Sequence, residues 1–171
     1  MKQLILMRHA KTEPWVEGID DHARALTTTG RDAAVAMSVA LDEIGWKPDL
    51  VLVSTSRRTR ETWSLLSPVF QTADVRYEDD LYLAGDRNIR DIVTEADSHS
   101  CVMIVGHNPG MHDLAVRLVR EGGTNDFLAA EAVSNKMPTG AVALFEAEED
   151  GAFQPFSFKL QRFIRPKDLV A

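Results

Sequence analysis

The sequence predicts an α/β fold in which a mostly parallel central sheet lies between two layers of helices. Three short segments, at 3–8, 50–53 and 101–105, are apolar nearly throughout and have the length of strands. Such runs are typical of strands that are buried on both faces of a sheet. Segments with helical periodicity follow each of them, and this alternation is the pattern of a parallel sheet with helical crossovers. We therefore expect a three-layer α/β/α sandwich.

The first of these units contains the longest predicted loop. Residues 3–8 form its strand, and the polar residues 10–27 form the loop. Thr29 and Asp32 have the spacing of a capping box, and apolar residues then recur at helical intervals, which predicts a helix over 29–44.

Two more strand and helix units follow along the chain. Pro48 turns the chain into the strand at 50–53, and a helix is expected from Arg57 to about Phe70. A third strand is predicted near 74–78 and a helix over 87–96.

The last third of the chain changes from alternating units to a hairpin. The acidic turn from Glu148 to Gly151 lies between two apolar segments, which is a hairpin pattern. The predicted elements here are a strand at 101–105, helices at 111–121 and 126–134, and hairpin strands at 141–147 and 153–163.

Composition limits the classes of protein to consider. A length of 171 residues with 44% hydrophobic content suits one domain over 1–171. The single cysteine, Cys101, excludes an internal disulfide and favours a reducing, cytoplasmic setting. No stretch has the pattern of a signal peptide or a membrane span, so we expect no membrane partner. A net charge of −7 argues against a nucleic-acid partner but allows a small basic pocket.

Polar residues follow three of the predicted strands at the point where each strand ends. They are Arg8 and His9, then the segment from Ser54 to Arg58, then His107 and Asn108. Carboxyl ends of parallel strands share one edge of a sheet, and ligands bind there. We expect these side chains to converge, together with the start of the helix that follows Gly110.

This set of residue types favours phosphoryl chemistry. Arginine offers a planar fork of donors that matches phosphate oxygens, and a helix N-terminus adds aimed N–H groups. A neutral imidazole can attack phosphorus and form a covalent intermediate. A second, protonated histidine would stabilise charge on the transferred group. No metal or other cofactor is required by this chemistry.

Three motifs in this order resemble the histidine phosphatase superfamily, in its phosphoglycerate mutase-like branch. They are Arg8-His9-Ala10, then Ser54 with Arg58-Thr59 and Thr62, and then the segment from Val105 to Gly110. The loop from Asp21 to Gly30 and the segment from Pro138 to Gly140 are similar to those of its short SixA-type phosphohistidine phosphatases. The resemblance implies a phosphoglycerate mutase-like fold that lacks a lid insertion.

Carried over position by position, the resemblance implies specific roles. His9 would be the phosphorylated nucleophile, Arg8 and Arg58 would bind the phosphoryl group, and His107 would be the second pocket histidine. Asn108 is a further candidate for substrate binding. Arg24 with Asp21 is equally compatible with a structural ion pair and with a part of the pocket, and Arg57 and Arg60 are expected to be solvated helix charges.

The position of the family's usual general acid differs in this chain. Leu83 stands where relatives often have glutamate, and Asp80 or Asp86 would have to fold back to replace it. An alkoxide leaving group needs a proton, whereas the imidazole of phosphohistidine can be protonated before its P–N bond breaks. The absence of an acid and of a lid therefore favours phosphohistidine in a partner protein as the substrate.

Three alternatives remain open at this stage. One is a phosphatase for small phosphorylated metabolites, which would need an acid such as Asp80 or Asp86. Another is a mutase, which is disfavoured because little chain remains to close over an intermediate. The last is a non-catalytic module that binds phosphate, against which the histidine pair argues.

Overall fold

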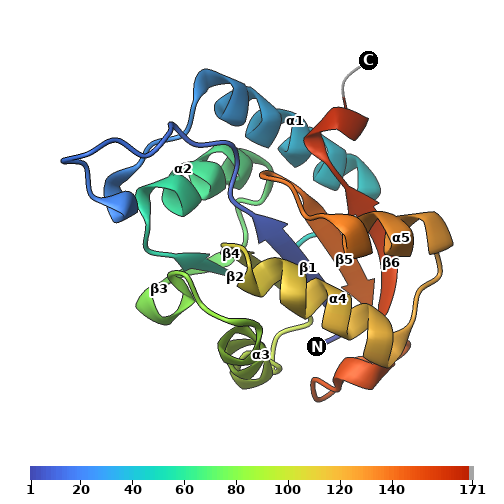
Figure 1. Ribbon diagram of the computed structural model, residues 1–171. Coiled ribbons are helices and arrows are strands. Elements are labelled where there is room, and N and C mark those ends of the chain that lie inside the picture. The colour runs from blue at the N-terminus through green and yellow to red at the C-terminus, as the bar shows by residue number, and fades with distance from the viewer. Residues whose placement is uncertain (170–171) are drawn as a thin grey trace.

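The computed structural model describes residues 1–169 of the chain and is built around a six-stranded sheet (Figure 1). Its strands are β1 (Gln3–Arg8), β2 (Leu50–Ser54), β3 (Asp74–Glu78), β4 (Cys101–Gly106), β5 (Val142–Glu146) and β6 (Lys159–Ile164). The helices are α1 (Thr28–Ile44), α2 (Arg57–Leu66), α3 (Asp86–Glu95), α4 (Gly110–Gly122) and α5 (Phe127–Asn135).

The sheet is mostly parallel, as expected. Its strand order is β3-β2-β4-β1-β5-β6. The pairs β3–β2, β2–β4 and β4–β1 are parallel, whereas β5 runs antiparallel to both β1 and β6. Helices cover both faces, so the predicted three-layer α/β/α sandwich is confirmed.

Two apolar cores fill the space between the sheet and the helices. Side chains alternate between the two faces of a strand, so Leu4 and Leu6 of β1 join one core while Ile5 and Met7 join the other. The first core lies against α3, α4 and α5, and the second lies against α1 and α2 (Figure 1). Burial on both faces explains why β1, β2 and β4 are apolar nearly throughout.

Helix boundaries differ from the predictions in two places. The N-cap of α1 is Thr27, whose hydroxyl accepts from the Gly30 N–H, so Thr29 is not the cap. The α-helix expected to reach Phe70 ends at Leu66 and is followed by a short 3₁₀ turn over Ser67–Val69. Pro68 lies in that turn, and its missing N–H cannot continue the α-helical hydrogen bonds.

The predicted C-terminal hairpin exists with a longer connection. β5 and β6 pair antiparallel, but β6 begins at Lys159 rather than at 153. Pro155 opens a 3₁₀ turn over Pro155–Ser157, and the buried rings of Phe153 and Phe158 anchor the segment in the core. The connection is ordered by burial, so a tight turn at 148–151 was the wrong interpretation.

One edge of the sheet gathers the polar residues singled out from the sequence. β1, β2 and β4 end at this edge because they are parallel, and antiparallel β5 begins there. The connection from β3 to α3 is short, at 79–85, and holds only a 3₁₀ turn over Asp79–Leu81. No helix in residues 1–169 has the length and apolar character needed to cross a bilayer.

Candidate active site

His9 directly follows β1 and is nearly buried, with 7% of its surface exposed. Its Nδ1–H donates to the carbonyl oxygen of Ala10 at 2.8 Å, which leaves Nε2 with a free lone pair. Burial lowers the pKa of His9 to about 4, and the charges of Arg8 and Arg58 add to that effect against the opposing Ala10 hydrogen bond. His9 is therefore a neutral imidazole at neutral pH, with one defined nitrogen available for attack.

The backbone around His9 is held by three separate segments. The N–H of His9 donates to the Gly106 carbonyl at 3.1 Å, and the Gly140 N–H donates to the His9 carbonyl at 2.8 Å. The Ala10 N–H donates to Thr62 Oγ1 of α2 at 3.0 Å. These bonds tie the turn after β1 to β4, to α2 and to the segment before β5. Positioning of this kind fixes a nucleophile before substrate arrives.

His107 follows β4 and faces His9, with 5.4 Å between the ring centroids. It is 2% exposed, and its Nε2 lies 2.7 Å from the hydroxyl oxygen of Ser54. Burial lowers the pKa of His107 to about 3, and the neighbouring charge of Arg58 contributes. In the protein without ligand His107 is therefore neutral at neutral pH, because a buried imidazolium beside arginines is unfavourable.

Arg58, in the first turn of α2, is 3% exposed and is held by Asp21. Its guanidinium donates to the Asp21 carbonyl at 2.8 Å and to Asp21 Oδ2 at 3.1 Å. Asp21 also accepts from the hydroxyl of Tyr82 at 2.5 Å and from Arg24 at 3.0 Å. These donors, with the Tyr82 hydroxyl as the largest cause, lower the pKa of Asp21 to about 2. Asp21 and Arg24 thus form an ion pair that is also part of the pocket wall.

Within residues 1–169, two buried side-chain nitrogen atoms have no hydrogen-bond partner, either backbone or side chain. They are Nε of Arg8 and Nδ1 of His107. The rest of the Arg8 guanidinium donates to the Met137 carbonyl at 3.2 Å. Buried polar atoms without partners are costly and therefore rare. Both residues line the pocket described next, where a ligand with several acceptor oxygens, such as a phosphoryl group, is suited to pair with Arg8 Nε and with a protonated His107 Nδ1.

The four predicted residues share one pocket of about 300 Å³ with Asn108. Asn108 lines the wall, but its amide N–H₂ donates to the Met137 carbonyl at 2.9 Å and its Oδ1 accepts from the His112 N–H. Asn108 is thus already engaged in holding the loop. The full lining is Arg8, His9, Thr12, Asp21, Arg24, Arg58, Leu83, His107, Asn108 and Thr139.

Neither proposed substitute for the general acid lies in this pocket. Asp80 is exposed on the turn after β3, and Asp86 pairs with Arg117 at 2.8 Å. Leu83 lines the pocket instead, in a left-handed backbone conformation with φ of 52° that is unusual for a leucine. Among the lining residues Asp21 alone carries a carboxyl group, and its lowered pKa makes it an acceptor rather than a proton donor.

The start of α4 does not contribute to the pocket as expected. The N–H of Met111 donates to the His107 carbonyl, and that of His112 donates to Asn108 Oδ1, so these donors are occupied. No residue of α4 lines the pocket. Gly110 is needed here for packing, because a Cβ atom at this position would lie 1.9 Å from the Ala84 carbonyl oxygen.

The remaining arginines of α2 point away from the site, as expected. Arg57 pairs with Glu61 at 2.7 Å, and the Arg60 guanidinium lies 5.0 Å from the ring centroid of Tyr77. Neither lines the pocket. Tyr82 is not among the residues predicted from the sequence, yet its ring packs edge-on against His107 and its hydroxyl donates to Asp21. A tyrosine in an irregular segment carries no sequence pattern that would reveal this contact.

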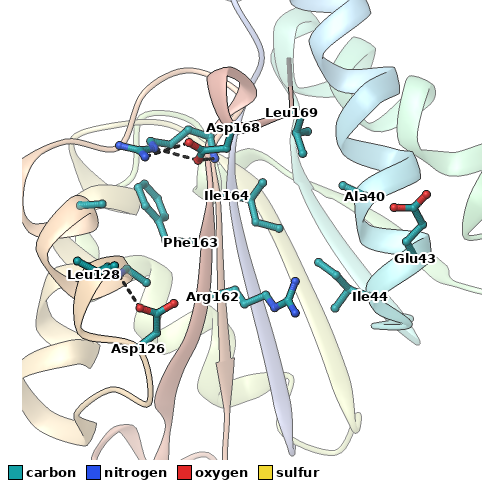
Figure 2. A pocket seen from close by; sticks show the side chains of 13 residues that line it. Ala40, Glu43, Ile44, Asp126, Leu128, Arg162, Phe163, Ile164, Asp168 and Leu169 are labelled. Carbon is teal, nitrogen blue, oxygen red and sulfur yellow. Dashed lines mark hydrogen bonds and ion pairs between the residues drawn. The ribbon is translucent and has the colours of Figure 1, made fainter. Parts of the chain in front are cut away.

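A larger hollow, of about 680 Å³, lies at the open edge of the sheet between α1, α5 and β6 (Figure 2). Its walls carry the apolar Ile44 and Leu128 and the charged Arg162 (Figure 2), together with the Arg165–Asp168 ion pair. No histidine lines it. In the described part of the chain, no group of three or more His, Cys, Asp and Glu side chains is arranged to hold a metal ion. The predicted catalytic residues lie in the smaller pocket instead.

Comparison with known proteins places the chain among relatives of one superfamily. The family model of the histidine phosphatase superfamily (branch 1) matches residues 4–82. A Mycobacterium tuberculosis (strain H37Rv) protein, whose name states no function, is 36% identical over 146 residues, covering 81% of this chain and 85% of the relative. A chloroplast protein of Arabidopsis thaliana, also without a stated function, is 30% identical and covers 99% of this chain and 80% of its own length.

Solved structures with the same fold include proteins provisionally described as the phosphohistidine phosphatase SixA. The one from Agrobacterium tumefaciens is 28% identical with a TM-score of 0.81, covering 96% of this chain and 98% of that one. The one from Nakamurella multipartita is 29% identical with a TM-score of 0.80 and covers 96% of both chains. A protein histidine phosphatase SixA complexed with tungstate shares the fold at 20% identity, with a TM-score of 0.76 and coverage of 98% and 99%.

Proposed function

The chain belongs to the histidine phosphatase superfamily, and from this premise we propose that it is a metal-independent phosphatase that forms a phosphohistidine intermediate on His9. The observation that carries the proposal is the fixed tautomer of His9. Its Nδ1–H is bound to the Ala10 carbonyl, so the Nε2 lone pair is free in a pocket lined by three arginines. A neutral nitrogen nucleophile beside cationic donors suits attack on a negatively charged phosphoryl group.

The reaction would proceed in two steps. In the first, the lone pair of His9 Nε2 forms a bond to phosphorus while the bond from phosphorus to the leaving group breaks. Arg8, Arg58 and His107 donate to the equatorial oxygens, where charge is held in the transition state. In the second, a water oxygen attacks the phosphorus, the bond to His9 Nε2 breaks, and inorganic phosphate leaves. The free enzyme is regenerated with His9 neutral.

We propose phosphohistidine in a partner protein as the substrate. The pocket wall carries Leu83 where an acid would be useful, and its one carboxyl, on Asp21, is held ionised. A leaving group that can carry its own proton is therefore favoured over an alkoxide. The short connection at 79–85 places no helix over the pocket mouth, which suits a residue presented on the surface of another protein.

The test is a time course of phosphate release, in the presence of a chelator, from three substrates. These are a phosphohistidine peptide, an aryl phosphate and an alkyl phosphate. Fast release from the peptide with slow alkyl turnover is the expected result. Faster alkyl turnover would overturn the substrate assignment and indicate a small phosphorylated metabolite.

Two variants test the mechanism. His9→Ala should abolish release from all three substrates and should leave no acid-labile phosphoenzyme after rapid quenching. His99→Ala is the matched control, since His99 lies outside the pocket and its ring contacts the hydroxyl of the neighbouring Ser98. Retained turnover in His9→Ala would rule out His9 as the nucleophile, and phosphate binding without any turnover in the unmodified protein would indicate a binding module.

A further inference from the structure

Ser54 lies at the end of β2 with no exposed surface, and its hydroxyl contacts the ring of His107. The distance from Ser54 Oγ to His107 Nε2 is 2.7 Å, which is a short, good hydrogen bond. No other partner of the Ser54 hydroxyl is found among residues 1–169. The second ring nitrogen of His107, Nδ1, is buried and has no hydrogen-bond partner in the described part of the chain.

Two arrangements of protons are compatible with this contact when His107 is neutral. In the first, Nε2 carries the ring proton and donates to Ser54, so the buried hydroxyl hydrogen has no acceptor and the bare Nδ1 also stays unsatisfied. In the second, the Ser54 hydroxyl donates to Nε2 and the ring proton sits on Nδ1. The second arrangement satisfies the hydroxyl and leaves one donor to be paired, whereas each buried unsatisfied group costs stability.

We propose that Ser54 is a positioning residue that holds His107 as the neutral Nδ1–H tautomer, so that this histidine donates to a phosphoryl oxygen without being charged. The proposal rests on the proposed function for the identity of the ligand. Its physical basis is separate, because it concerns a buried hydroxyl and a ring in the protein alone. An unprotonated Nδ1 would present its lone pair to a phosphoryl oxygen, and the two lone pairs would repel each other. A protonated Nδ1 donates a hydrogen bond to that oxygen instead.

The surroundings of the ring favour a neutral donor over a charged one. Arg58 and Arg8 already place two positive charges near His107, and both raise the cost of a third. The Tyr82 ring packs edge-on against the imidazole at a centroid distance of 5.5 Å, which fixes the plane of the ring. A neutral imidazole held in one tautomer is thus ready to donate at neutral pH, while the arginines supply the charge.

The first test is spectroscopic and requires no substrate. A long-range proton–nitrogen correlation spectrum of uniformly ¹⁵N-labelled protein at neutral pH distinguishes the two neutral tautomers of a histidine and the imidazolium. The spectrum of the His107→Asn variant identifies the His107 signals by their loss. The expected result is the Nδ1–H tautomer. An Nε2–H tautomer or an imidazolium in the wild-type protein would overturn the proposal, whatever the enzyme's substrate is.

The second test is a double-mutant cycle that separates positioning from packing. Asparagine at 107 places its amide nitrogen where Nδ1 stands, since both are three bonds from Cα, but it has no atom in place of Nε2. Ser54→Ala should weaken the binding of inorganic phosphate and lower kcat/KM for an aryl phosphate, each by about tenfold. In the His107→Asn background the same change should have no further effect, because the atom through which Ser54 acts is gone.

The outcomes distinguish this inference from the proposed function. Equal losses from Ser54→Ala in both backgrounds would mean that Ser54 only packs, and the proposal would be wrong. If wild-type protein neither binds inorganic phosphate nor releases it from any substrate, the proposed function fails, and the spectrum still decides the tautomer. Should Ser54→Ala not fold, Ser54→Cys keeps the volume with a weaker donor and is expected to give a partial loss in the same direction.

Discussion

Acidification from about pH 7.5 to about pH 5 is expected to remove about 4 kcal/mol from the free energy of unfolding. The cause is the burial of two neutral histidines. The pKa of His9 is lowered to about 4 and that of His107 to about 3, against an ordinary value of 6.5. The unfolded chain therefore takes up protons as the pH falls below about 6.5, while the folded protein does not.

The direction and size of the effect follow from proton linkage. A histidine with a lowered folded pKa contributes fully above the unfolded value and loses that contribution as the pH falls toward the folded value. A pH of about 5 lies about 1.5 units below the unfolded pKa of a histidine, and each unit lowers the free energy of unfolding by about 1.36 kcal/mol. The loss is therefore about 2 kcal/mol for each of the two histidines. Asp21, with a pKa of about 2, loses its contribution only at lower pH and lies outside this window.

The assay is urea unfolding followed by circular dichroism at several pH values in this range. The double variant His9→Asn/His107→Asn provides the control, because asparagine cannot be protonated in this range, so its stability should be nearly independent of pH here. A flat profile in the wild-type protein would refute the reasoning that burial keeps the two rings neutral. An equally steep profile in the double variant would assign the acid sensitivity to other groups.

Three further outcomes are expected. Arg58→Ala should lower kcat/KM for an aryl phosphate by roughly a hundredfold or more, because a guanidinium that binds the transferred group is lost. Steady-state kinetics measure this change, and an unchanged kcat/KM would exclude Arg58 from the site. Tyr82→Phe removes the hydroxyl that donates to Asp21, and we expect about a tenfold loss in kcat/KM with little change in the thermal unfolding profile. Full activity would mean that Asp21 positions Arg58 without help from Tyr82. Gly110→Ala should lower the free energy of unfolding in urea by about 3 kcal/mol, because the new Cβ would lie 1.9 Å from the Ala84 carbonyl oxygen. A variant as stable as the wild-type protein would contradict this close approach.

Elements with a strong local pattern were predictable from the sequence. Apolar runs identified β1, β2 and β4, and helical periodicity identified α1 within a residue of its start. Errors arose where a tertiary contact decided the local structure. The segment before β6 follows the burial of Phe153 and Phe158, and the first N–H groups of α4 are taken by the loop before it rather than by the pocket.

The gathering of the site residues at one edge of the sheet was also predictable from the sequence, because the alternation of strands and helices indicates a parallel sheet. Parallel strands end at one edge, so Arg8, His9, Arg58 and His107 had to meet once their strands were recognised. Leu83 lines the pocket, and the structure places neither Asp80 nor Asp86 there. The sequence was compatible with two roles for Asp21 and Arg24, a structural ion pair and a part of the pocket, and the structure shows both.

The sequence by itself thus determined the chemical types at the site and the edge of the sheet where they gather, because hydrophobic periodicity specifies strands and helices through local geometry. Only the tertiary structure decided the protonation of those residues. Burial and neighbouring charge hold His9 and His107 neutral, and single contacts with Ala10 and Ser54 select which nitrogen is free. The protonation state and tautomer of a histidine depend on desolvation and on contacts made in the folded protein, so they do not follow from the residue type alone.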